Sequence, residues 1–390
     1  LKLMREPSLL DPADRSLKVQ QLILRRVLRL VSRGGNQTIK DLRGAIGSNL
    51  ILGDNSANIL TFGTANDTTF DGVASGNGGI LKQGGGTFTV SGFNTYSGPT
   101  TISAGKFQAS APNTFSPNST ITLANQTGVS LELNNFNQTL GSLGGGGTMG
   151  GNVNLGTATL TLGNNNASSI YNGVIEGTGG LNKVGTGATT LAGVNTYTGK
   201  TIIDQGSLII TGSLANINAV TVNVGGIFDL SSTLSAQIIG DLDGMDGEIK
   251  LNSQGLILGT LNNTTFGGIM SGTGGVTKTG SGTTTFSGAN TYSGTTTVES
   301  GTLTLDAGGS IGQSAAVNLS TAGATFNIAT AGNQVIQDLS GVSDTTVVLG
   351  NNVTDALTFG TANSTTFGGD ASGNGGITKQ GSGTTTFSGA

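Results

Sequence analysis

A block of about 100 residues recurs along this chain, and this internal repetition constrains the fold more than any other feature. The clearest part of the repeat reads Ser-Gly-Thr-Gly-Gly-Val-Thr-Lys-Thr-Gly-Ser-Gly-Thr-Thr-Thr-Phe-Ser-Gly-Ala-Asn-Thr-Tyr-Ser-Gly at 271–294 and continues to Leu305. Related copies begin at Ser75, Glu176 and Ser372. Each copy lies inside a longer block that opens at Gln37, Gln138, Gln237 or Gln334, which gives the super-repeats 36–136, 137–235, 236–332 and a truncated 333–390. Such a chain is expected to fold as a stack of equivalent units.

Short segments between the glycines alternate apolar and hydroxyl side chains. The stretches 302–305 and 159–162 both read Thr-Leu-Thr-Leu, and this period of two is typical of a strand with one buried face. Gly-Ser-Gly and Gly-Asn-Gly-Gly turns separate the segments. Strands this short need neighbours, and coiling them so that each turn pairs in parallel with the next satisfies every backbone group. The sequence therefore predicts an all-β fold, a parallel β-helix (β-solenoid), with an array of β-sandwiches as the alternative.

The composition excludes several functional classes. The 390 residues include 69 Gly but no Cys, His or Trp. Without Cys, neither a disulfide, a thiolate nucleophile nor a Cys–zinc site can form. Without His, the usual general base at neutral pH and the commonest transition-metal ligand are missing. No apolar run reaches the roughly 18 residues expected of a membrane-spanning helix.

Residues 1–35 differ from the rest of the chain. This head has a net charge of +5, whereas the remaining 355 residues have −9. Its apolar residues recur at helical intervals at Leu17, Leu24, Leu28 and Val31. The pattern predicts a basic head that is helical or disordered, and a membrane-surface or export segment is one interpretation. Arg25 and Arg26 interrupt the apolar stretch and no small-residue cleavage site follows, so an unusual leader, a linker or a misread start is favoured over a membrane-surface or export segment.

The segment at 274–303 closely resembles the autotransporter-associated β-strand repeat, also called the passenger-associated transport repeat. The resemblance is carried by Gly-Gly-Val-Thr-Lys-Thr-Gly-Ser-Gly, Thr-Phe-Ser-Gly and Asn-Thr-Tyr-Ser-Gly, which follow one another in this segment. Three full copies and a truncated one cover a little over a third of the body. The combination of motifs is specific, and the segments between the copies match the family only in general character.

The resemblance implies a passenger of type V secretion. Such a passenger is exported, threaded through an outer-membrane β-barrel translocator and folded outside as a right-handed β-helix. The implied partner is therefore a β-barrel translocator outside this segment, and the implied location is the bacterial cell surface or the medium. The family associates the repeat with translocation and folding and assigns it no catalytic residue or cofactor.

One acidic stretch is a weak candidate for a calcium site. Alternating carboxylates on a glycine-rich turn can supply oxygen ligands to Ca²⁺, and such carboxylates occur at Asp241, Asp243, Asp246 and Glu248. Their spacing matches neither the EF-hand loop nor the repeat of calcium β-rolls. Asp41 and Asp338 occupy the repeat column of Asp241 without the other acids. A solvated acidic turn is the favoured interpretation, and no metal site is predicted.

An enzyme that cleaves polysaccharides would need two or three converging carboxylates. Asp204 and Glu299 share one repeat column but lie 95 residues apart, which predicts a separation of several turns. Asp229 and Glu132 stand alone in the sequence. We therefore predict no catalytic residues and no enzyme activity in this segment.

Two residue types mark the copies. Lysine recurs at Lys82, Lys183, Lys278 and Lys379, and tyrosine recurs at Tyr96, Tyr197 and Tyr292. One lysine per hundred residues is too sparse for a basic patch, and the acidic body opposes nucleic-acid binding, so an exposed structural position is predicted for the lysines. The tyrosines are predicted to pack in turns, with a sugar-stacking surface as the alternative.

These patterns favour a non-catalytic stalk that supports translocation and displays a distal region at the cell surface. The alternative is an adhesin whose β-helix face binds a ligand on a host cell or a neighbouring cell. A polysaccharide-acting enzyme is the third and least favoured possibility.

Overall fold

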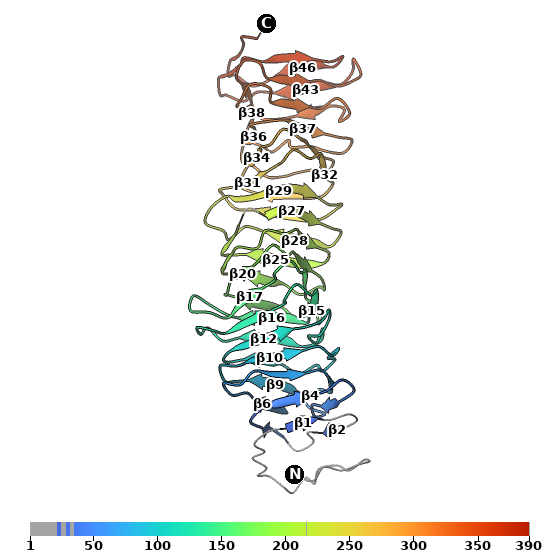
Figure 1. Ribbon diagram of the computed structural model, residues 1–390. Helices are drawn as coiled ribbons and strands as arrows, with labels where there is room; N and C mark the ends of the chain where they lie inside the picture. The colour runs from blue at the N-terminus through green and yellow to red at the C-terminus, as the bar shows by residue number, and fades with distance from the viewer. Residues whose placement is uncertain (1–21, 25–28, 32–34, 216, 390) are drawn as a thin grey trace. The chain divides into compact units, whose positions relative to one another are not determined.

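The structure, a computed structural model, describes residues 22–24, 29–31, 35–215 and 217–389. It divides into unit 1, residues 1–199, and unit 2, residues 200–390. Each unit is a parallel β-solenoid without helices among its described residues (Figure 1). None of these residues therefore belongs to a helix that could cross a membrane. The prediction of a parallel all-β solenoid is confirmed, and the β-sandwich alternative is wrong.

The strands of unit 1 stack into ladders in which neighbours are hydrogen-bonded. The first ladder contains β1 (Leu22–Leu24), β4 (Leu42–Gly44), β7 (Thr68–Phe70), β10 (Thr87–Val90), β12 (Lys106–Ala109), β14 (Ser130–Glu132), β17 (Asn152–Asn154) and β20 (Ile175–Glu176). The second contains β3 (Gln37–Thr38), β6 (Ile59–Phe62), β9 (Gly79–Lys82), β11 (Thr100–Ile102), β13 (Thr120–Leu123), β16 (Ser142–Gly145), β19 (Ser169–Tyr171) and β22 (Thr189–Leu191). Shorter ladders are formed by β2 (Arg29–Val31), β5 (Asn49–Ile51) and β8 (Val73–Ser75), and by β15 (Gln138–Leu140), β18 (Leu160–Leu162) and β21 (Leu181–Lys183); β23 (Val194–Asn195) completes the unit.

Unit 2 is built in the same way. Its longest ladder contains β24 (Thr201–Ile203), β27 (Ile217–Val222), β29 (Gln237–Asp243), β31 (Leu256–Leu258), β34 (Val276–Lys278), β36 (Thr296–Val298), β38 (Val317–Leu319), β41 (Leu339–Gly341), β44 (Thr365–Phe367) and β47 (Thr385–Phe387). A second contains β32 (Thr264–Phe266), β35 (Thr283–Phe286), β37 (Thr302–Leu305), β39 (Thr325–Asn327), β42 (Thr346–Val348) and β45 (Asp370–Ser372). The others contain β25 (Gly206–Ile210), β28 (Gly226–Asp229), β30 (Glu248–Leu251) and β33 (Ile269–Gly272), and β40 (Gln334–Val335), β43 (Ala356–Phe359) and β46 (Gly376–Lys379); β26 (Ser213–Leu214) completes the unit.

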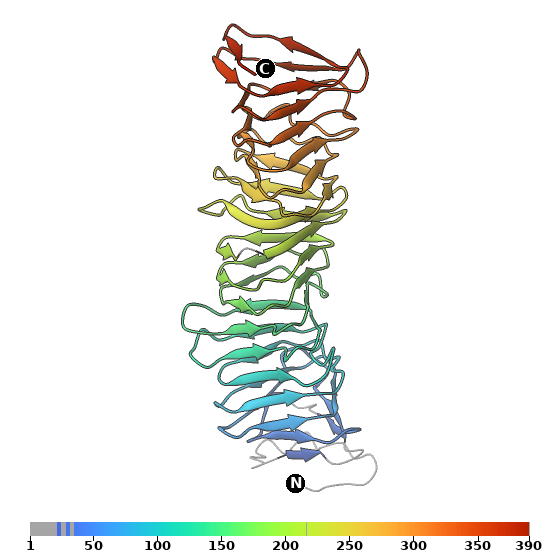
Figure 2. The same ribbon diagram turned by 45° about the horizontal axis from the view of Figure 1, so that its top comes forward.

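The register of the ladders explains the repeat length and the core. Phe88 pairs with Thr68 and with Phe107, which are 20 and 19 residues away, so one turn of the solenoid uses about 20 residues. Because successive side chains of a strand point to opposite faces, each inward residue stacks on its equivalent in the next turn. The rings of Phe88 and Phe107 stack with their centroids 5.5 Å apart. Figure 2 shows the resulting layers of strands within each unit.

The predicted basic head is described only in part. Residues 22–24 form β1 and residues 29–31 form β2, which pair in parallel with β4 and β5. The helix expected over these six residues is therefore wrong. A parallel neighbour satisfies the backbone groups of such three-residue strands, and the helical spacing of the apolar residues does not outweigh it. Leu17 and Leu28, which also supported the helix, lie outside the described residues.

Candidate functional site

Each repeat-marker lysine is the last residue of its strand and enters a Lys-x-Gly turn. Lys82, Lys183 and Lys278 are only 1–2% exposed, whereas Lys379 is exposed. The exposed position predicted from sequence is therefore wrong for three of the four. The reason is the strand period: in β34, Val276 and Lys278 point inward and Thr277 outward.

The lysine ammonium groups bind carbonyl oxygens of the turns. Nζ of Lys278 donates hydrogen bonds to the carbonyls of Gly280, at 2.8 Å, and of Ser300 in the next turn of the solenoid, at 3.1 Å. Nζ of Lys82 donates equivalently to the carbonyls of Gly84, at 2.8 Å, and Ala104, at 2.9 Å. Each of these two lysines therefore links two successive turns.

These lysines and the buried tyrosines predict an alkaline maximum of stability. Burial lowers the pKa of Lys82, Lys183 and Lys278 from 10.5 to about 8. Between pH 8 and 10.5 these lysines are neutral in the folded chain but still protonated in the unfolded chain. The free energy of unfolding therefore rises with pH over this range. Burial also raises the pKa of Tyr96 from 10.0 to about 12. Above pH 10 this tyrosine is ionised in the unfolded chain but still neutral in the folded chain, so the free energy of unfolding falls. We expect the urea midpoint, followed by far-UV circular dichroism, to peak near pH 10; a steady decline from pH 8 would contradict this.

The three repeat-marker tyrosines are buried, with exposures of 0–3%. The hydroxyls of Tyr96 and Tyr292 lie 2.7 Å from the hydroxyl oxygens of Thr100 and Thr296. Rings in this position cannot stack on a sugar from solvent, so that alternative is wrong, and the tyrosines pack inside the solenoid.

The acidic stretch at 241–248 is the weak candidate for a calcium site. No group of three or more carboxylates comes together in the part of the chain that the structure describes. Asp241 instead accepts hydrogen bonds from the side chains of Thr260 and Asn262 in the next turn, and Glu248 lies 3.9 Å from Lys250. Asp243 accepts from the backbone N–H of Thr265, at 3.3 Å, and Asp246 is exposed in a turn with φ +55°.

The repeat column of Asp241 forms a recurrent clamp that sequence reasoning missed. Asp41 accepts from Thr64, at 2.8 Å, and Asn66, at 3.1 Å. Asp338 binds the equivalent residues, with distances of 2.8 Å to Thr361 and 2.9 Å to Asn363. A carboxylate bound to Thr-x-Asn of the following turn therefore recurs three times. The shared Thr-x-Asn sequence, 23 residues after two of these aspartates, is the signal that could have revealed it.

The other carboxylates considered for catalysis make their own local contacts. Asp204 follows β24 and accepts from Asn223, at 2.7 Å. Glu299 follows β36, and four strands of the same ladder lie between β24 and β36. Asp229 binds Ser231 beside it. Asp204 and Glu299 therefore lie several turns apart, as their spacing in the sequence predicts.

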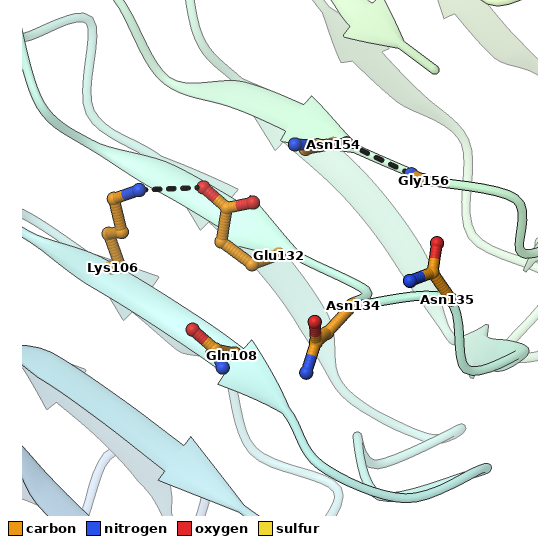
Figure 3. Close-up of a pocket in the computed structure, with 7 residues that line it drawn as sticks. All are labelled: Lys106, Gln108, Glu132, Asn134, Asn135, Asn154 and Gly156. Atoms are coloured by element: carbon orange, nitrogen blue, oxygen red, sulfur yellow. Dashed lines mark hydrogen bonds and ion pairs between the residues drawn. The ribbon is translucent and has the colours of Figure 1, made fainter. Parts of the chain in front are cut away.

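Glu132 lies in a polar pocket on the outer face of unit 1, which we call the β12–β14 pocket (Figure 3). Its volume is about 180 Å³. It is lined by Lys106, Gln108, Glu132, Asn134, Asn135, Asn154 and Gly156. Apart from Glu132, sequence reasoning singled out none of these residues.

The strand register places the lining residues together. Gln108 pairs with Glu132, and Glu132 pairs with Asn154, so these three side chains form one outward column across β12, β14 and β17. Asn134 and Asn135 follow β14 in the left-handed conformation, with φ +51° and +65°. Asparagine tolerates this conformation better than most residues, and the turn brings both amides to the edge of the pocket (Figure 3).

One ion pair lies in the pocket. Nζ of Lys106 is 3.2 Å from Oε1 of Glu132, with side-chain exposures of 51% and 17%. The same carboxylate oxygen accepts a hydrogen bond from the hydroxyl of Ser130, at 2.7 Å. Because the pair is partly exposed, it contributes little to stability, but it presents a donor and an acceptor side by side.

Comparisons with known proteins agree with the repeats described above. The passenger-associated-transport-repeat family matches residues 80–109, 181–210, 276–305 and 377–390. A relative described as "Adhesin BmaC autotransporter" from Brucella suis biovar 1 (strain 1330) is 41% identical over 147 residues, which is 37% of this chain. The chain spans only 4% of that relative's length. No solved structure matches the chain.

Proposed function

We propose that this chain, which carries three full passenger-associated-transport repeats and a truncated one, is a non-catalytic passenger segment of a bacterial autotransporter that supports translocation and surface display. The stacking of equivalent turns carries the proposal. Each turn hydrogen-bonds to the next, as when the N–H of Gln83 donates to the carbonyl of Phe62 and the N–H of Ser103 to that of Lys82.

Such stacking gives a physical basis for directional folding. A turn that is already folded presents unpaired backbone groups to the next segment of chain, which can add by parallel pairing. Addition outside the cell would oppose backward movement through an outer-membrane β-barrel translocator. The proposed location is the cell surface or the medium.

Export is tested by placing the 390-residue chain upstream of an autotransporter β-barrel in a Gram-negative host, with an epitope at its N-terminus. We expect the epitope to become accessible to antibody and to added protease on intact cells. The control is an equally long Gly/Ser-rich linker in place of the chain, which is expected to reduce epitope display at least fivefold. Equal display of the linker would contradict a role in translocation.

An adhesin is the second candidate function. The name of the Brucella suis relative, "Adhesin BmaC autotransporter", favours this function. The β12–β14 pocket on the outer face also favours it. Saturable retention of the purified chain on epithelial cells, measured by flow cytometry, would support adhesion. Export without any such retention would leave the stalk role alone.

A further inference from the structure

We propose that the β12–β14 pocket binds one sugar unit of an uncharged oligosaccharide. The inference deepens the adhesin candidate, on which its biological meaning rests. The physical argument uses only the size, the hydrogen-bonding groups and the charge of the pocket.

The size of the pocket suits one sugar ring. Its volume is about 180 Å³, which at ~30 Å³ per water in the liquid corresponds to roughly six waters. A hexose displaces about the same number of waters from solution. Larger drug-like ligands need pockets of roughly 300–1,000 Å³, so only one unit of a chain would enter.

Backbone hydrogen bonds to two asparagine side chains leave their NH₂ groups available as donors. Oδ1 of Asn135 accepts from the backbone N–H of Thr157, at 2.9 Å, and Oδ1 of Asn154 accepts from that of Gly156, at 2.9 Å. With these oxygens engaged, each side chain keeps its Nδ2 group for a ligand. Figure 3 shows Nδ2 of Asn154 on the side away from Gly156.

Two further amides supply both donors and acceptors. No described residue provides a hydrogen-bond partner for the side chains of Gln108 and Asn134. Each therefore offers one carbonyl oxygen and one NH₂ group. A sugar hydroxyl donates one hydrogen bond and accepts others, so neighbouring hydroxyls can use such amides in both senses.

The charges of the pocket favour a neutral ligand. The ammonium of Lys106 and the carboxylate of Glu132 largely cancel. A charged ligand would gain little, because its attraction to one of these groups is offset by repulsion from the other, whereas a hydroxyl can donate to the carboxylate while a neighbouring hydroxyl accepts from the ammonium.

Unit 2 contains three equivalent strands, but their outward residues differ from those that line the pocket. The inward residues of β37, β39 and β42 are apolar, as in β12, β14 and β17. The outward positions equivalent to Lys106, Gln108, Glu132 and Asn154 are Thr302, Thr304, Asn327 and Val348. The pocket is thus a local departure from the repeat, which a purely structural face does not require.

The test measures binding of defined oligosaccharides to the 390-residue chain by titration calorimetry at pH 7. The probes are cellotriose, maltotriose, chitotriose and lactose, with trigalacturonate as the acidic comparison. We expect at least one neutral probe to bind with a Kd of about 1 mM or tighter. Raising NaCl to 0.5 M should leave this Kd unchanged, because no net charge is neutralised.

Three pocket variants and one control complete the experiment. Gln108→Ala, Lys106→Ala and Glu132→Gln each change an outward side chain and should weaken binding at least tenfold, whereas Thr304→Ala in unit 2 should leave it unchanged. The proposal is overturned if no neutral probe binds, if only trigalacturonate binds, or if the pocket variants bind normally. Cell retention that persists in these variants would overturn a role of the pocket in adhesion, while adhesion by another surface would remain supported.

Discussion

Replacing Gly280 by alanine is expected to destabilise the surrounding turns of unit 2 by about 4 kcal/mol. Gly280 is the glycine of a Lys-x-Gly turn and has φ +68°. A Cβ atom there would lie 2.3 Å from the carbonyl oxygen of Thr260 in the preceding turn. Alanine would therefore suffer both an unfavourable φ and a backbone collision that separates two stacked turns. Native-state hydrogen exchange of the amides of β34 and β36 measures this local loss.

Gly323 provides the matched control for this substitution. It also has a positive φ, +85°, but no atom lies within 4 Å of the position of its Cβ. Gly323→Ala should therefore cost only the backbone term, about 1 kcal/mol. Equal effects of the two substitutions would show that close stacking of the turns contributes nothing at Gly280.

Replacing Lys278 by alanine is the second large perturbation, with an expected loss of about 3 kcal/mol. Nζ donates to the carbonyls of Gly280 and Ser300 as well as to that of Thr279 next to it. Alanine removes these donors and leaves a cavity where the aliphatic stem was buried. Hydrogen exchange at the amides of β36 reports the loss locally, because a long repeat need not unfold in one step.

Lys278→Met separates the two causes. Methionine fills most of the volume but donates no hydrogen bond, and it avoids burying a charge. We expect it to recover about 1 kcal/mol relative to alanine. Full recovery to the stability of the lysine protein would mean that the lysine acts only by packing.

The general fold was predictable because it follows from two periods that are visible in the sequence. The alternation in Thr302–Leu305 gives the strand and its inward face, and the copies that surround it give the stacking partner. The burial of Lys278 follows from the same alternation, since it is two residues after Val276. An exposed position was predicted for Lys278 because it is charged, although the alternation places it inward, and that prediction was wrong. Residues 29–31 show the opposite case, where a local helical spacing is overridden by parallel pairing with β5.

The β12–β14 pocket could not be predicted in the same way. Gln108, Glu132 and Asn154 are 24 and 22 residues apart, and only the exact register of three turns brings them into one column. Turn lengths vary along the chain, so an average repeat length does not fix this register. What the sequence does contain is a contrast: the stretch Lys-Phe-Gln-Ala at 106–109 stands where the third copy has Thr-Leu-Thr-Leu.

That contrast has an evolutionary consequence. Phe107 and Leu303 are buried at equivalent positions of their copies, while the residues on either side of them differ in charge and size. Mutations at the outward positions can thus change the chemistry of the surface while leaving the buried positions unchanged. Similar copies can therefore acquire different exteriors separately, along a single inherited scaffold.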